Sequence, residues 1–146
     1  MELALLIGIQ ASGKSTFCAR ELHNTHLRLC RDVLHTDNRM LVLFHAALAV
    51  QAPIALDNTN PSLSSRARFI RAAKAAGYTV VGYYFDTPVD VALARNAARD
   101  GRWRVPDKAI VGTAAKLSMP SHAEGFDTLW RVEPSADGFS LSPLER

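Results

Sequence analysis

Eight residues near the start of the chain have the types and spacing of a phosphate-binding loop. They run from Gly8 to Ser15 and read G-I-Q-A-S-G-K-S, which fits the pattern G-x-x-x-x-G-K-[ST]. The two glycines let the backbone wrap so that successive N–H groups point at one anion. Lys14 is expected to reach the β- and γ-phosphates of a nucleoside triphosphate, and the hydroxyl of Ser15 to ligate the bridging Mg²⁺. The residues expected to line the nucleotide site are Gly8, Gln10, Ala11, Ser12, Gly13, Lys14, Ser15 and Thr16.

The segments on either side of this loop are those that a phosphate-binding loop requires. Residues 3–7, L-A-L-L-I, form an apolar run suited to a buried strand. Residues 16–20 can open a helix whose positive dipole end points at the same phosphates. A chance match in an ordinary turn would lack this strand and helix, so the sequence predicts a nucleotide-binding site.

Two aspartates, Asp32 and Asp57, stand at the ends of the expected second and third strands, residues 27–30 and 53–57. The carboxyl ends of parallel strands form one ligand-binding edge, so both should face the crevice that holds Lys14. Asp32 could accept a proton from an attacking hydroxyl, although a helix cap or a surface ion pair would also explain it. Asp57 could contribute to the coordination shell of Mg²⁺, although its neighbours in the segment D-N-T-N-P are also typical of a turn.

Two groups of basic residues follow. The first surrounds Gly101 at a helix end, and such a turn can close as a lid that neutralises a transferred phosphoryl group, or can be a solvated face. Its members are Arg95, Arg99, Arg102 and Arg104. The second lies along the expected helix 62–76, and we interpret it as a solvated basic face or, alternatively, as a nucleic-acid contact. Its members are Arg66, Arg68, Arg71 and Lys74.

Strands and helices alternate along the chain. Hydrophobic runs predict strands at 3–7, 27–30, 53–57, 78–85 and 126–132. Helices are expected at 14–23, 38–51 and 62–76. A fourth helix is expected to begin with Pro88 as its first helical residue and to run through Arg99, and a fifth to run from a cap at Asp107 to residue 117. This alternation implies an α/β fold, a P-loop NTPase three-layer sandwich with a central, mostly parallel sheet and an arginine-bearing lid. We expect residues 1–146 to form a single domain.

The composition is that of an ordinary globular domain. Hydrophobic residues make up 48% and charged residues 21%, and the net charge of +3 fits a polyanionic substrate without demanding one. The two cysteines, Cys18 and Cys30, are expected to be buried, reduced thiols. No apolar stretch reaches about 20 residues and no charged leader precedes the first strand, so we expect no membrane association and a cytoplasmic location. The oligomeric state stays open.

Several short segments beyond the phosphate-binding loop occur in a distinctive order. They are L-C-R-D at 29–32, I-A-L-D-N-T-N-P at 54–61, S-R-A-R at 65–68, A-R-N-A-A-R at 94–99, V-P-D-K-A-I at 105–110 and P-S-H-A-E-G-F at 120–126. Together with residues 8–17 they resemble the kinase module of 5′-hydroxyl polynucleotide kinases, of the phage type and especially of the animal kinase-phosphatase type. The resemblance covers nearly the whole chain, and its D-N-T-N-P and E-G-F elements are more specific than the loop itself.

The resemblance implies transfer of the γ-phosphate of ATP to the 5′-hydroxyl end of DNA or RNA, an activity used in nucleic acid repair. Lys14 and Ser15 would hold ATP and Mg²⁺, and Asp32 would be the general base. Asp57 would support the acceptor and the metal, and Arg99 would touch the ATP phosphates.

One position departs from this pattern. The phage branch has an arginine three residues after the base, where it holds the 3′-phosphate of the acceptor, and this chain has His35 there. Arg31 or Arg39 could take that role.

Two alternatives to a polynucleotide kinase remain open from the sequence. The same module is widely reused, so a small-molecule kinase acting on a nucleoside, sugar or antibiotic hydroxyl is the first. The second is a nucleotide-dependent binding module in which Asp32 does no chemistry.

Overall fold

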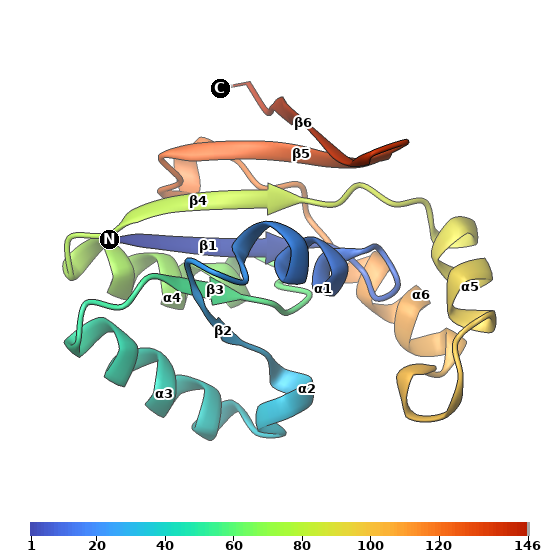
Figure 1. Ribbon diagram of the computed structural model, residues 1–146, viewed down its shortest axis with the longest axis horizontal. Coiled ribbons are helices and arrows are strands. Elements are labelled where there is room, and N and C mark those ends of the chain that lie inside the picture. Colours follow the sequence, from blue (N-terminus) through green and yellow to red (C-terminus); the bar gives the residue numbers. More distant parts are fainter. Residues whose placement is uncertain (146) are drawn as a thin grey trace.

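The computed structural model describes residues 1–145, in which six strands form one sheet in the order β2-β3-β1-β4-β5-β6 (Figure 1). Five strands are parallel: β1 (Glu2–Ile7), β2 (Leu27–Leu29), β3 (Ile54–Leu56), β4 (Thr79–Tyr84) and β5 (Thr128–Ser135). The sixth, β6 (Gly138–Pro143), pairs antiparallel with β5 at one edge. The predicted α/β class with a mostly parallel central sheet is confirmed.

Helical segments connect the strands. The longer ones are α3 (Asp37–Ala49), α4 (Leu63–Ala75), α5 (Val89–Ala97) and α6 (Asp107–Lys116). The shorter ones are α1 (Lys14–Phe17), which continues as the π-helical turn η1 (Cys18–Leu22), then α2 (Arg31–Leu34), η2 (Gly101–Trp103) and η3 (His122–Glu124). Among residues 1–145, no helix combines the length and the apolar character that a membrane crossing needs.

The central strand β1 explains why helices cover both faces of the sheet. Its side chains alternate between the faces, as in any strand, and all from Leu3 to Ile7 are buried. Leu3, Leu5 and Ile7 belong to a cluster with α3 and α4, whereas Ala4 and Leu6 belong to another with α1 and η1. A strand buried on both faces reads as a continuous apolar run, which is how residues 3–7 appear in the sequence.

The structure differs from the sequence prediction at a few boundaries. Strand β6 was not predicted, because Gly, Ser and Pro dilute its pattern and its position depends on pairing with β5. Asp32 does not end a strand directly but lies in the short helix α2. Each of three predicted helix starts shifts by one residue, so that the N-caps of α3, α5 and α6 are Thr36, Pro88 and Pro106.

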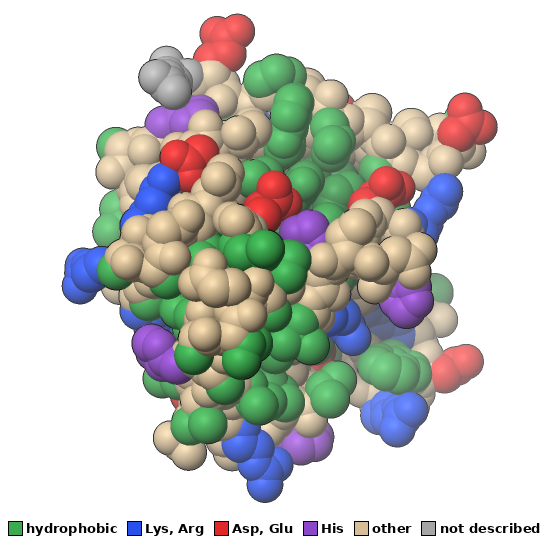
Figure 2. All heavy atoms as spheres, turned by 60° about the vertical axis from the view of Figure 1, so that its left-hand side comes forward, with side chains coloured by type: hydrophobic (Ala, Val, Ile, Leu, Met, Phe, Trp, Pro, Cys, Tyr) green, Lys and Arg blue, Asp and Glu red, His purple; other side chains and the backbone are tan. Residues whose placement is uncertain are grey.

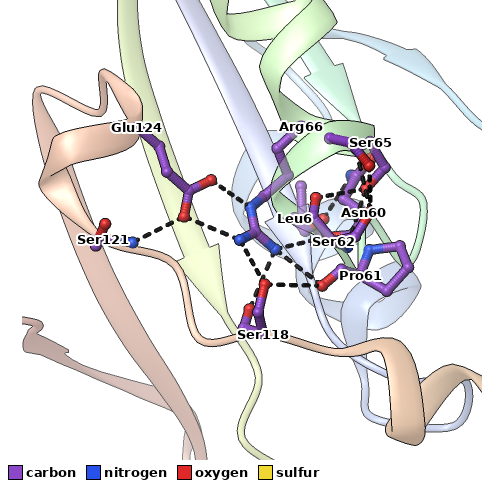
Figure 3. Close-up of polar contacts among 10 residues, drawn as sticks. Leu6, Asn60, Pro61, Ser62, Ser65, Arg66, Ser118, Ser121 and Glu124 are labelled. Atoms are coloured by element: carbon purple, nitrogen blue, oxygen red, sulfur yellow. Dashed lines mark hydrogen bonds and ion pairs between the residues drawn. The ribbon is translucent and has the colours of Figure 1, made fainter.

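A buried ion pair between α4 and η3 corrects the interpretation of one basic residue. Arg66 is fully buried rather than part of a solvated face, and its Nε and Nη2 donate to Glu124 at 2.7 and 2.9 Å (Figure 3). Its Nη1 donates to the carbonyls of Asn60, Pro61 and Ser118 at 3.0–3.1 Å. Every charged atom of the pair therefore has a partner, which is the condition under which a buried charge is tolerated.

The other members of this basic series lie at the surface. Lys74 pairs with Asp127 at 2.5 Å, and Arg68 lies over the ring of Phe69. Arg71 is exposed, so apart from Arg66 the series lies on a solvent-exposed face, as both the solvated-face interpretation and a nucleic-acid contact require.

The buried pair also supports the phosphate-binding loop through the turn at residues 57–61. The side-chain amide of Asn60 donates to the carbonyl of Leu6 at 2.7 Å, and the N–H of Gly8 donates to the carbonyl of Thr59 at 3.0 Å. Asn60 has a φ of 44°, a left-handed conformation that needs support from its surroundings. Because Arg66 binds the Asn60 carbonyl, the ion pair fixes the turn on which the start of the loop rests.

Replacing Glu124 with alanine should lower the free energy of unfolding by about 3–5 kcal/mol, because Arg66 would keep a buried charge without its partner. The measurement is urea unfolding followed by circular dichroism. Glu133→Ala, which removes an exposed carboxylate from β5, is the matched control and should change stability by about 0.5 kcal/mol or less. A loss below about 1 kcal/mol for Glu124→Ala would show that the pair contributes little.

Candidate active site

The phosphate-binding loop, residues 8–15, lies between the end of β1 and the start of α1. Gly8 lies very close to Phe85, the residue that follows β4. A Cβ atom at position 8 would lie 2.9 Å from the Cβ of Phe85. Gly13 is the N-cap of α1 with a φ of 97°, a conformation that favours glycine. Both glycines of the motif are therefore required by the geometry of the loop and not only by its pattern.

Lys14 is folded back over the loop. Its Nζ donates to the carbonyls of Gly8 and Ile9 at 2.9 and 2.6 Å and to the Oγ of Ser12 at 3.3 Å. Burial is the main cause that lowers the pKa of Lys14 to about 8; the charges of Asp57 and Asp32 oppose this shift, and that of Arg99 adds to it. A buried ammonium among neutral carbonyls would gain from an anion, which is what a triphosphate would supply.

Ser15 and Asp57 are brought together at the start of α1. The Ser15 hydroxyl donates to the Oδ2 of Asp57 at 3.0 Å, and the Asp57 side chain is only 2% exposed. Arg28 on β2 holds the same oxygen, with its Nε at 2.8 Å and its Nη2 at 2.6 Å. The sequence analysis missed Arg28; the available signal was a basic residue between two leucines in a strand of a buried sheet.

This hydroxyl–carboxylate pair fits a Mg²⁺ site that relies on a bound triphosphate. Mg²⁺ prefers oxygen ligands, and in phosphoryl-transfer sites it takes one or two protein oxygens plus phosphates and water. Within residues 1–145, no cluster of three or more His, Cys, Asp or Glu side chains could form a complete metal cage. Ser15 and Asp57 are therefore the residues that could hold the ion, with the remaining ligands supplied by substrate and solvent.

Asp32 is exposed at the same edge of the sheet. Neither structural alternative explains it, because within residues 1–145 its carboxylate forms no ion pair and no helix-capping hydrogen bond. Its charge acts on Lys14, so the two side chains share one electrostatic environment. A free carboxylate within electrostatic range of the lysine of a phosphate-binding loop can serve as a proton acceptor.

The residues around Asp32 bind one another. Arg31 donates from its backbone N–H to Asn58 at 2.8 Å and forms an ion pair with Asp37 at 2.7 Å. Arg39 donates to the carbonyl of Leu34 at 3.4 Å, and His35 caps α2 with a φ of 70°. Of the two arginines considered as substitutes for the position of His35, Arg31 is thus the first residue of α2, and Arg39 lies in α3 with its side chain on the carbonyl of Leu34.

The arginine turn, residues 99–104, follows α5 and includes η2. It is exposed throughout, and the Nη1 of Arg99 donates to the carbonyl of Trp103 at 3.3 Å. Asn96, which the sequence analysis did not single out, is fully buried and binds both the N–H and the carbonyl of Val105 at 3.0 and 2.7 Å. The turn is therefore fixed at its base and open at its tip, where Gly101 has a φ of 52°.

The rest of the loop contacts α5 and α6. Gln10 donates to the Oγ1 of Thr113 at 3.0 Å and leaves its own Oε1 buried without a partner in the described chain. Arg95 donates to the carbonyl of Ala11 at 3.4 Å. Thr16 is exposed on α1, whereas Ser12 is buried against Lys14. Both cysteines are buried, as predicted, and within residues 1–145 neither forms a disulfide.

Comparisons with known proteins agree with this geometry. A family model described as an AAA domain matches residues 3–120. The chain is 25% identical over 135 residues to the "bifunctional polynucleotide phosphatase/kinase" of Schizosaccharomyces pombe, which covers 90% of this chain and 33% of that protein. It is 29% identical over 138 residues, with the same coverage, to a relative from Acanthamoeba polyphaga mimivirus whose description names the same kind of protein. These two relatives confirm the predicted resemblance to polynucleotide kinase modules.

The extent of these matches differs between relatives and structures. The chain spans about a third of the length of the curated relatives it matches. A sugar kinase from Janibacter sp. HTCC2649 has the same fold, with a TM-score of 0.68 at 16% identity, over 90% of this chain and 85% of that one. At this identity, the likeness to the sugar kinase concerns the fold alone.

Proposed function

The chain belongs to the AAA-domain family, and on that premise we propose that it transfers the γ-phosphate of ATP to the 5′-hydroxyl of a DNA or RNA strand. The observation that carries this proposal is the free carboxylate of Asp32 at the edge that also holds Lys14 and the Ser15–Asp57 pair. The polynucleotide phosphatase/kinase relatives, matched over 90% of the chain, support a nucleic acid as the acceptor.

In the proposed reaction, the 5′-oxygen of the acceptor attacks the γ-phosphorus of ATP. The proton of the hydroxyl passes to the carboxylate of Asp32, and the bond from the γ-phosphorus to the β–γ bridging oxygen breaks to release ADP. Lys14 leaves the carbonyls of Gly8 and Ile9 to bind the phosphates, and Arg99 neutralises charge on the transferred group. Mg²⁺, when held at Ser15 and Asp57, would neutralise the β- and γ-oxygens.

A panel of acceptors tests this proposal. Labelled ATP is offered with 5′-hydroxyl oligonucleotides, nucleosides and sugars, and we expect label to be transferred to oligonucleotides. Single-stranded DNA that already carries a 5′-phosphate should compete, less so as salt rises, because phosphate contacts release counterions. Transfer to sugars or nucleosides alone would identify a small-molecule kinase, and ATP binding without any transfer would identify a non-catalytic module.

Arg99→Ala should reduce turnover by about a hundredfold, the scale of losing one donor to the transition state. Arg99 is the residue of the turn whose charge acts on Lys14. Arg102→Ala and Arg104→Ala are matched controls in the same turn; they should leave kcat nearly unchanged and lower the salt slope of oligonucleotide binding by about one per lost phosphate contact. Three single variants, assayed with ATP and oligonucleotide varied separately at two salt concentrations, test this. Equal small effects from all three would contradict a special role for Arg99.

A further inference from the structure

Trp103 lies at the tip of the arginine turn and is 61% exposed. Tryptophan is highly buried on average, so a largely exposed indole is an unusual use of apolar surface. The second tryptophan of the chain, Trp130 on β5, follows the ordinary pattern and is half-buried. Nothing in the proposed phosphoryl transfer uses the indole of Trp103.

The turn around Trp103 is mainly basic, since it carries Arg99, Arg102 and Arg104 and a single carboxylate, Asp100. The guanidinium of Arg102 lies 4.8 Å from the centroid of the indole ring, and Arg99 donates to the Trp103 carbonyl. Across residues 1–145, neither these arginines nor Arg95 and Arg104 form an ion pair with a carboxylate. An exposed aromatic ring beside free guanidiniums matches the chemistry of single-stranded nucleic acid, whose bases stack on aromatic faces while its phosphates take arginines.

The position of the turn places this surface beside the reacting groups. The turn and α2 both lie beyond the carboxyl ends of the strands, the edge at which the phosphate-binding loop lies (Figure 1). Arg99 and Asp32 both act on the charge of Lys14, so the side chains of both lie within electrostatic range of that lysine. On the face shown in Figure 2, by contrast, basic side chains lie apart, with hydrophobic and acidic side chains between them. The arginine turn is therefore the more suitable contact for a strand.

We propose that Trp103 stacks on an unpaired nucleobase near the 5′ end of the acceptor, with Arg102 and Arg104 beside the phosphates of the strand. This inference rests on the proposed function and adds the form of its substrate. A base inside a duplex has a stacked neighbour on each face and cannot place a face on an indole without being unpaired, and in a blunt duplex only the outer face of the terminal pair is open. The acceptor is accordingly a single strand or a frayed end, in preference to a blunt duplex.

Kinetics of Trp103→Ala test the stacking contact. We expect KM for a single-stranded 5′-hydroxyl oligonucleotide to rise about 10- to 100-fold, the range for loss of one base–aromatic stack, with kcat and KM for ATP unchanged. Trp103→Phe should keep much of the affinity because it keeps an aromatic face. Val50→Ala removes an exposed apolar side chain after α3, at the opposite edge of the sheet, and should change nothing.

Two further measurements distinguish an acceptor base from the adenine of ATP. In a Trp130→Phe background Trp103 is the only tryptophan, and its fluorescence should be quenched by the oligonucleotide but not by ADP. Three oligonucleotides can be compared, each lacking the base at one of the first three positions. One of the three should bind the unmodified enzyme more weakly than the intact oligonucleotide does. Trp103→Ala should show no additional loss at that position, because the stack is already absent.

Different failures have different meanings. An increased KM for ATP, or quenching by ADP, would assign the indole to the nucleotide and overturn the inference while leaving the proposed function intact. Equal use of blunt duplexes and single strands by the unmodified enzyme, with no effect of Trp103→Ala, would overturn it in the same way. Failure of the unmodified enzyme to phosphorylate any oligonucleotide would overturn the proposed function and this inference together.

Discussion

Replacing Lys14 with alanine should abolish phosphoryl transfer while leaving the fold intact. The ammonium group binds only carbonyls and a hydroxyl of its own loop, so that no buried carboxylate loses a partner when it is removed. Burial lowers the pKa of Lys14, so part of the loss is offset, and the free energy of unfolding should fall by no more than about 1–3 kcal/mol, the cost of leaving buried acceptors without this donor. Turnover, in contrast, should fall by at least about a thousandfold, since the β- and γ-phosphates lose their main cationic contact.

The Lys14→Ala experiment needs turnover and stability measured on the same protein. Transfer from labelled ATP gives turnover, and urea unfolding gives stability. Lys108→Ala, which removes an exposed lysine from α6, is the matched control and should behave as the unmodified protein. Near-normal turnover of Lys14→Ala on any acceptor would overturn the assignment of the chain as a nucleotide-dependent kinase.

Asp32→Asn should lower turnover by about a hundredfold or more, the usual scale for loss of a general base. Asparagine keeps the size of the side chain but cannot take the proton of the attacking hydroxyl. The fold should not change, because the carboxylate has no hydrogen bond or ion pair to lose within residues 1–145. The affinity for ATP should also stay the same, since in the proposed reaction Asp32 acts on the acceptor rather than on the triphosphate.

Calorimetric titration with a non-hydrolysable ATP analogue separates the two possible roles of Asp32. Asp90→Asn, at an exposed position in the first turn of α5, controls for loss of a surface charge and should leave both turnover and binding unchanged. If Asp32→Asn lost nucleotide binding but kept its turnover per bound ATP, Asp32 would be a metal ligand and not the base.

Local patterns were sufficient to predict the central part of the fold. Residues 3–7 are apolar without interruption because β1 is buried on both faces, and the glycines of the loop meet conformational requirements that few other residues meet. Ser62 caps α4 in a capping box with Ser65, and Gly77 follows its end with a φ of 80°, as expected for a helix stop. In each case the residue and its structural cause lie within a few positions of each other.

The residues that the sequence analysis missed or misinterpreted depend on distant partners. From the local sequence, Arg66 looks like a residue of a solvated helix face. Its burial is possible only because the fold places Glu124, 58 residues later in the chain, against its guanidinium. Arg28 acquires its role from Asp57, which directly follows the neighbouring strand β3, and Asn96 acquires its role from Val105 across the arginine turn. No periodicity within a short window carries such information, because each partner alone is an ordinary polar residue.

The Arg66–Glu124 pair has a consequence for how this chain can change by mutation. A lineage that loses either residue first would pass through an intermediate with an unpaired buried charge, and the intermediate would be selected against. Replacement of both by apolar residues of similar volume would remove that barrier, but it requires two simultaneous changes in separate segments. Among descendants of a common ancestor, the residues at positions 66 and 124 should therefore be inherited together. A homologue that lacks the arginine at position 66 should also lack the glutamate at position 124.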